Sequence, residues 1–204
     1  MKKSFRSIIK FLGLGSVILT SIFLFSCAGS SSLMKEVATD DATYDVGADE
    51  AMVIFMRPSG MGFAIQSTVF EVGPDGEEFI GVVPAKKKVI YRTKPGKHTF
   101  MVVGESADFM RAELEAGKKY YGVVIPRMGV WKARFSLGAV HHDIEPQKLK
   151  DWATGCSLVE NTPDAYTWAE RNANDIHKKH KSYYEKWQKK AEKDKPTLNP
   201  DDGF

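Results

Sequence analysis

A regular alternation of short apolar runs and turn residues between Ala51 and His142 constrains the fold of this chain most strongly. The runs are rich in Val, Ile, Phe and Tyr and are separated by Gly, Pro and Asp, a pattern typical of antiparallel sandwiches. It predicts seven or eight strands. We expect them at Ala51 to Arg57, Ala64 to Val72, Glu78 to Val83, Lys88 to Thr93, Lys97 to Gly104, Met110 to Glu115, Lys119 to Pro126 and Trp131 to Leu137.

Turn chemistry supports several of these boundaries. Gly-Pro-Asp-Gly at 73–76, Lys-Pro-Gly-Lys at 94–97 and Ala-Gly-Lys at 116–118 have the composition of hairpin turns. No helical pattern separates the strands, which argues against a parallel α/β sheet. The sequence therefore predicts a mainly β protein, an antiparallel β-sandwich over residues 50–143.

A C-terminal α-helical extension is expected over residues 144–195. A short helical turn fits Pro146 to Trp152, and Thr162-Pro163-Asp164 provides the start of a longer helix that ends near Lys193. Apolar and aromatic residues recur along it every three or four positions, which favours docking onto the sandwich over a partner-facing helix. Residues 196–204 are expected to be a disordered tail.

Residues 1–26 have the form of an export signal. Lys2, Lys3, Arg6 and Lys10 precede an apolar segment from Phe11 to Phe25. That segment is too short and too often interrupted by Gly, Ser and Thr to favour a spanning helix, which needs about 20 apolar residues. We therefore predict that residues 1–26 are removed.

Leu24-Phe25-Ser26-Cys27 resembles the lipobox of bacterial lipoproteins. The resemblance implies diacylglycerol on Cys27, which anchors the chain in the lipid bilayer. Residues 27–49 then form a flexible tether. Ala28 resembles the outer-membrane sorting pattern, if the cell has two membranes. The alternative is a secretory signal cut after Ala28, which would give a secreted soluble binding protein.

The charge balance argues against nucleic-acid binding. The whole chain has 29 basic and 26 acidic side chains, but four of the basic ones lie in the signal. The remainder is close to neutral, without the strongly basic character that a nucleic-acid-binding domain has.

The stretches FMRPSGMGF, VIYRTKPGKHTF and LEAGKKYYGVVIPRMG resemble an uncharacterised domain of bacterial lipoproteins. Members of that family are similar to PEGA-type sandwiches and, more distantly, to transthyretin-like modules. The resemblance covers residues 50 to 140. It implies a binding or scaffolding role in the cell envelope and no particular activity.

Five histidines raise the question of a metal site: His98, His141, His142, His177 and His180. The last two lie three residues apart on the predicted helix, so they share one face, and His141-His142-Asp143 is a candidate to complete a site. Adjacent strand residues point to opposite faces, and nearby lysines repel a cation. Solvated or interfacial histidines are therefore favoured, and we expect no metal and no cofactor.

No catalytic residue stands out. The glycine-containing loop after Arg57 is followed by a strand rather than by the helix that a phosphate site needs. Cys156, the second cysteine, is interpreted as a small, partly buried residue rather than a nucleophile.

The favoured function is that of a noncatalytic binding or structural module of the envelope, with an envelope hydrolase or metal-dependent enzyme as the alternative. An unidentified envelope protein is the expected partner, and the Lys178–Lys195 helix is a candidate contact for anionic lipid. The expected partner contacts are Met61, Phe63, Tyr183 and Trp187.

Overall fold

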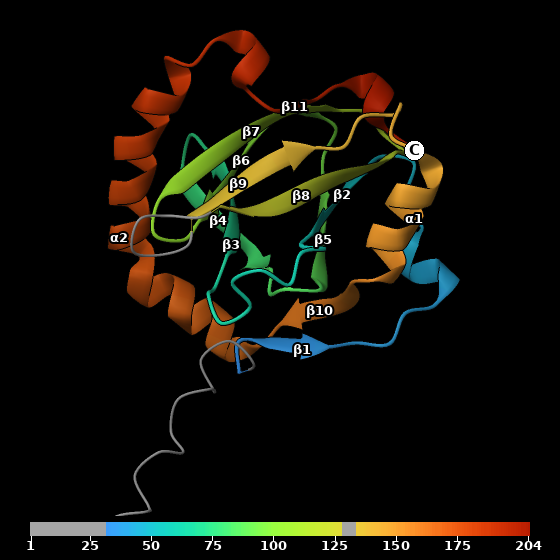
Figure 1. Ribbon diagram of the computed structural model, residues 1–204, viewed down its shortest axis with the longest axis horizontal. Coiled ribbons are helices and arrows are strands. Elements are labelled where there is room, and N and C mark those ends of the chain that lie inside the picture. Colours follow the sequence, from blue (N-terminus) through green and yellow to red (C-terminus); the bar gives the residue numbers. More distant parts are fainter. Residues whose placement is uncertain (1–31, 128–133) are drawn as a thin grey trace, which may run out of the picture.

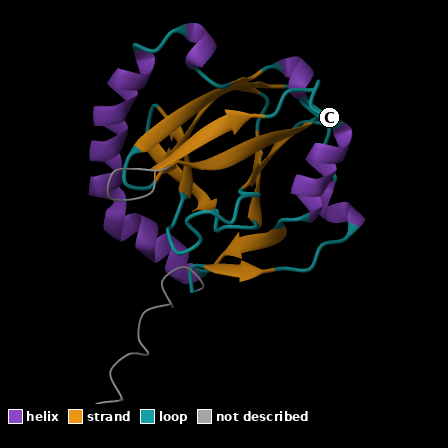
Figure 2. Cartoon of the chain, viewed as in Figure 1, coloured by secondary structure: helices purple, strands orange, loops and turns teal. Residues whose placement is uncertain are grey.

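In a computed structural model, residues 32–127 and 134–204 are described. They form two β-sheets in a sandwich-like arrangement, with α-helices along the outside (Figures 1 and 2). The predicted signal peptide, Cys27 and the start of the predicted tether lie outside the described residues. Within the described part of the chain, no helix combines the length and the apolar character needed to cross a bilayer.

The first sheet has six strands in the order β1-β10-β5-β2-β8-β9. β2 lies at its centre, antiparallel to β5 and parallel to β8, while β10 runs parallel to β5. The strands are β1 (Met34–Glu36), β2 (Ala51–Met56), β5 (Lys87–Thr93), β8 (Lys119–Arg127), β9 (Arg134–Ala139) and β10 (Ser157–Asn161).

The second sheet has five strands in the order β11-β7-β6-β3-β4. Hairpins join β3 to β4 and β6 to β7, and β11 adds to β7 in parallel. The strands are β3 (Thr68–Gly73), β4 (Gly76–Val82), β6 (Gly96–Val103), β7 (Ala107–Leu114) and β11 (Thr197–Leu198).

The mainly β character is confirmed, but the sheets are mixed rather than antiparallel. The parallel pairs are β2 with β8, β10 with β5 and β11 with β7. These pairs join strands that are distant in sequence, so no hairpin turn fixes their relative direction. The predicted strand at Ala64 begins only at Thr68, because the preceding residues belong to a loop.

The core lies between the sheets and consists mainly of inward-facing aromatic and branched residues. Phe55 of β2 and Phe100 of β6 meet edge to face, with ring centroids 5.0 Å apart, and both are fully buried. Gly122 of β8 makes room for this contact, since a Cβ there would lie 2.8 Å from the Phe55 ring. Burial of such side chains contributes about 2 kcal/mol each.

The helices are α1 (Pro146–Thr154) and α2 (Pro163–Gln188), together with short 3-10 helices at Asp41–Tyr44, Glu192–Asp194 and Pro200–Asp202. Figure 1 shows α2 along one side of the five-stranded sheet, where it contacts β7, β4 and β6. Ile176 and Trp187 are buried in that contact. The predicted docking of the helix is therefore confirmed.

The helix begins as predicted but ends early. Thr162 is the N-cap and Pro163 the first helical residue, although the Thr162 hydroxyl donates to the Ser32 carbonyl, 2.7 Å away, rather than capping the helix. The helix ends at Gln188 instead of near Lys193. The chain turns there, so that the Pro196 carbonyl can accept from the Arg111 amide at the edge of β7.

The expected flexible tether is partly wrong, and the expected disordered tail is wrong. From Ser32 onward the N-terminal segment is ordered, because Leu33 and Met34 are buried and β1 pairs with β10. At the other end, Leu198 is fully buried in β11, and the Asp202 carboxylate is held by hydrogen bonds. Both chain segments therefore extend the sheets rather than flank them.

Candidate functional site

The loop at 57–67, between β2 and β3, is organised by a buried arginine. Nη2 of Arg57 donates to the carbonyls of Met61 and Gly62, each 2.7 Å away, and Nη1 donates to the Ile65 carbonyl at 2.9 Å. The guanidinium also lies 4.7 Å from the centroid of the Phe135 ring. Burial lowers the pKa of Arg57. Three carbonyls fixed by one buried cation make this loop rigid.

This rigid loop presents apolar side chains to solvent. Phe63 is 76% exposed, Met61 53% and Ile65 37%. The two predicted contacts, Met61 and Phe63, are thus accessible to a partner. Gly62 lies between the first two with φ +64°, a left-handed conformation that favours glycine. We call Met61, Phe63 and Ile65 the apolar loop.

A groove of about 400 Å³ begins at the base of the same loop, at Pro58 and Ser59. β8 forms one wall, including the exposed Ile125, and α1 contributes Trp152. The full lining is Pro58, Ser59, Lys86, Val123, Val124, Ile125, Pro126, Asp151, Trp152 and Gly155. The loop and the groove together offer apolar surface of a kind that binds protein segments.

The two aromatic contacts predicted on the helix have a different role. Trp187 is only 4% exposed, so the prediction that it meets a partner is wrong. Its ring packs 5.8 Å from Phe109 of β7 and stacks on Tyr184. Tyr183 is partly buried and packs against the same cluster. These aromatics attach α2 to the sheet.

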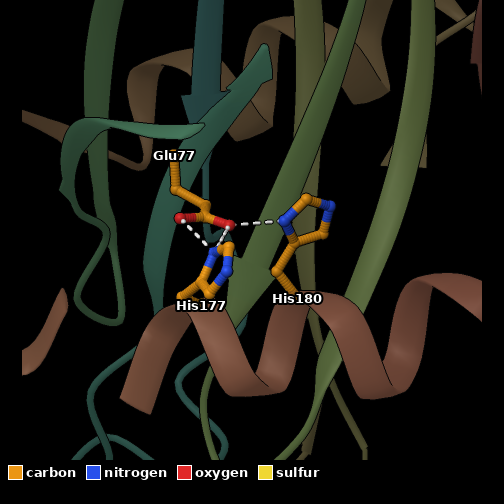
Figure 3. A group of neighbouring side chains, drawn as sticks. All are labelled: Glu77, His177 and His180. Atoms are coloured by element: carbon orange, nitrogen blue, oxygen red, sulfur yellow. Dashed lines mark hydrogen bonds and ion pairs between the residues drawn. The ribbon is translucent and has the colours of Figure 1, made fainter. Parts of the chain in front are cut away.

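A second group of side chains brings ionisable residues together. Glu77, near the start of β4, faces His177 and His180 of α2 (Figure 3). Nδ1 of His177 lies 3.0 Å from Oε1 of Glu77 and 3.3 Å from Oε2, and Nδ1 of His180 also contacts Oε1. One nitrogen or oxygen from each residue falls within 4.8 Å of the others.

The three side chains differ in exposure. The Glu77 side chain is 10% exposed and that of His180 17%, whereas that of His177 is 49% exposed. Burial raises the pKa of Glu77, but hydrogen bonds from His180 and His177 outweigh it, so the pKa lies below its usual value. A carboxylate and two imidazoles in this arrangement are metal-ligating groups.

Two features flank this cluster. Lys179, one of the lysines expected to repel a cation, pairs with Asp175 at 2.9 Å and donates to the Gly104 carbonyl at 3.0 Å. Glu77 also lines a cavity of about 240 Å³. This cavity is lined by Phe70, Glu77, Phe79, Tyr166, Ala169, Glu170, Ala173 and Ile176.

The remaining histidines lie in other networks. Nδ1 of His141 is 3.0 Å from Asp202, whose carboxylate also accepts from the His142 amide. The structure therefore does not join the His141-His142-Asp143 segment to His177 and His180. Nδ1 of His98 is 2.6 Å from Glu71, which also binds the Tyr91 hydroxyl.

Glu77 is the residue that sequence reasoning missed. It lies 100 positions before His177 and shows no local signal besides its place beside a turn. Cys156, predicted to be partly buried, is only 2% exposed, and burial raises the pKa of its thiol.

Comparison with known proteins adds no assignment, because neither a family model nor a curated protein matches the chain. The two surfaces are therefore interpreted from their own geometry.

Proposed function

We propose that this protein is a lipid-anchored, noncatalytic binding module of the bacterial cell envelope. Its apolar loop and the adjoining groove would hold an apolar segment of a membrane-associated envelope protein. The observation that carries the proposal is the loop held by Arg57, which exposes 76% of Phe63. A surface that is already rigid loses little conformational entropy when a partner binds.

The short connection to Cys27 supports a partner close to the membrane. Ser32, which binds Thr162, is five residues after the lipobox cysteine, a span of at most about 18 Å. The loop lies near the chain entry, because the Lys87 carbonyl accepts from the Arg57 amide and its ammonium pairs with Glu36 of β1. Acylation of Cys27 would therefore keep the apolar loop near the bilayer, the outer membrane in a cell with two.

The PEGA-like or transthyretin-like assignment stays part of this proposal. It is supported by the sandwich-like pair of sheets and by the hairpin turns. The alternative of a secreted protein cut after Ala28 would leave the same binding surface without an anchor.

Site-specific photocrosslinking in intact cells tests the function. A photoreactive phenylalanine analogue at Phe63 should give one dominant protein adduct, while the same analogue at Tyr166, which is 52% exposed on α2, should not. An adduct to lipid alone, or equal labelling from both positions, would contradict a protein partner at the loop.

The anchor is tested separately with the Cys27→Ser chain. Mass spectrometry of the wild-type protein should find a diacylated N-terminal cysteine, and the Phe63 adduct should weaken in Cys27→Ser. Absence of acyl groups on the wild-type chain would refute the lipid anchor. The binding role of the apolar loop would then be tested by the Phe63 photocrosslinking result alone.

The basic stretch Lys178–Lys195 is proposed as a weaker membrane contact. Several of its lysines are already paired within the protein, including Lys179 with Asp175 and Lys190 with Asp108. Fewer lysines are then available to contact anionic headgroups, and each lysine near the membrane surface contributes about 1 kcal/mol to binding. Salt-sensitive binding of the Cys27→Ser chain to anionic vesicles is the measurement.

A metal-dependent envelope enzyme is the second candidate, favoured by the convergence of Glu77, His177 and His180 beside a cavity. If it is correct, the zinc-loaded chain hydrolyses a chromogenic ester or peptide, and Glu77→Gln abolishes the turnover.

A further inference from the structure

The spacing of the Glu77, His177 and His180 ligand atoms is close to that of a zinc site. Bonds of 2.0–2.2 Å in tetrahedral geometry place ligand atoms roughly 3.4 Å apart. Nδ1 of His177 lies 3.0 Å from Oε1 of Glu77, and no two of the three ligand atoms are more than 4.8 Å apart. Small side-chain rotations would thus bring all three onto one ion.

The donor set also selects the kind of ion. Two imidazole nitrogens and one carboxylate oxygen suit Zn²⁺ and similar transition metals, whereas Ca²⁺ and Mg²⁺ prefer oxygen ligands throughout. Both imidazoles face the same carboxylate oxygen (Figure 3). One divalent ion in place of the shared protons would satisfy the carboxylate and the two imidazoles that now compete for it.

The surroundings hold the ligands in place and leave one side open. The His180 ring packs against Phe109 and Tyr184, with centroids 5.8 and 5.3 Å away. The Glu77 side chain is nearly buried, whereas His177 is half exposed, which leaves room for water as a fourth ligand. Within the described residues, neither histidine makes a hydrogen bond at Nε2.

We propose that Glu77, His177 and His180 bind one divalent transition-metal ion, with Zn²⁺ preferred, and that this ion fastens α2 to the β3–β4 hairpin. The ligands come from elements about 100 residues apart in the sequence. A bound ion would therefore cross-link the helical segment to the sheet. This role is independent of lipidation and of the partner at the apolar loop.

Metal titration of the full chain tests the site. The protein is purified in detergent without a histidine tag, stripped with a chelator and titrated with Zn²⁺ by calorimetry, with Co²⁺ absorbance as a second probe. We expect one equivalent to bind and the melting temperature to rise. Cys27→Ser should bind equally, which separates this result from that of the anchor.

Three variants locate the ion. His177→Ala and Glu77→Gln should each weaken Zn²⁺ binding at least tenfold, while the matched control His141→Ala, a half-exposed histidine on a different carboxylate, should not change it. Circular dichroism in the presence of chelator checks that each variant is folded; His177 is exposed enough to be replaced safely. Absence of stoichiometric binding, or binding unchanged in His177→Ala and Glu77→Gln, would overturn the proposal.

Discussion

Two glutamates of the β3–β4 hairpin, Glu71 and Glu77, each bind two partners, but in different surroundings. Glu71 accepts from the Tyr91 hydroxyl and pairs with Nδ1 of His98, whose Nε2 lies 2.9 Å from the Lys94 carbonyl. The His98 ring also stacks on Phe100 at 5.9 Å. Glu77 instead meets two histidines of a surface helix.

The difference lies in what each network leaves unused. In the Glu71 network both ring nitrogens of His98 have hydrogen-bond partners. No ring nitrogen is left for a ligand, so the role of this network is structural. In the Glu77 network two imidazoles share one acceptor and each keeps a ring nitrogen without a protein hydrogen bond among the described residues. The same residue types therefore form a core network in one place and a candidate ligand site in the other.

The largest effect is expected for Glu71→Gln, because it removes a partly buried charge that two donors require. We expect the free energy of unfolding to fall by about 3 kcal/mol, measured by urea denaturation. Glu78 is exposed on the same hairpin, so Glu78→Gln is the matched control. It should change the free energy of unfolding by less than about 0.5 kcal/mol. A loss below about 1 kcal/mol for Glu71→Gln would contradict a structural role.

The pH dependence of stability should follow the same pair. The hydrogen bond to the Glu71 carboxylate raises the pKa of His98, and burial opposes this only in part. Burial raises the pKa of Glu71, but the hydrogen bonds that it accepts from His98 and Tyr91 outweigh burial, so its pKa lies below the usual value. The His98 contribution is complete below the ordinary histidine pKa of 6.5 and is lost as pH rises through the raised value.

The Glu71 contribution is complete above the ordinary glutamate pKa of 4.5 and is lost as pH falls through the lowered value. The wild type should therefore exceed His98→Gln by about 1–2 kcal/mol between pH 4.5 and 6.5, with a smaller difference on either side. Urea denaturation of the wild type and of His98→Gln at several pH values measures this difference. A difference that stays the same from well below pH 4.5 to well above pH 6.5 would contradict this prediction, because it would show that the pair does not change charge on unfolding.

The smallest effect is expected for Glu77→Gln in the presence of chelator. Its partner His177 is half exposed and solvent replaces part of the interaction, so we expect a loss of about 1 kcal/mol or less. Urea denaturation of Glu77→Gln and Glu71→Gln in the same buffer measures this loss. A loss as large as that of Glu71→Gln would make the two networks equivalent and remove the distinction between them.

Local patterns predicted most of the strands because alternation and turn residues act over a few neighbouring positions. The strands β1, β10 and β11 were not predicted. They are short, and their pairing partners, such as Asn161 for Met34, are far away in sequence. The mixed direction of the sheets follows from the same long-range pairings and leaves no local trace.

The candidate sites were predicted in part. Helical spacing placed His177 and His180 on one face, and Met61 and Phe63 were predicted as partner contacts in the glycine-containing loop after Arg57. The Glu77 ligand and the Arg57 anchor could not be predicted, because both act through contacts that only the folded chain creates. Trp187 was misassigned because a semi-polar stripe does not show which of its aromatics face inward.

The position of β11 has a consequence for how this protein is made. Residues 197–198 pair with β7, so the five-stranded sheet lacks this edge strand until these residues have been synthesised. During that interval β7 presents free amides and carbonyls to neighbouring chains. A nascent chain that does not yet contain residues 197–198 would thus be more vulnerable to aggregation through β7, and pairing of β11 would remove that exposed edge.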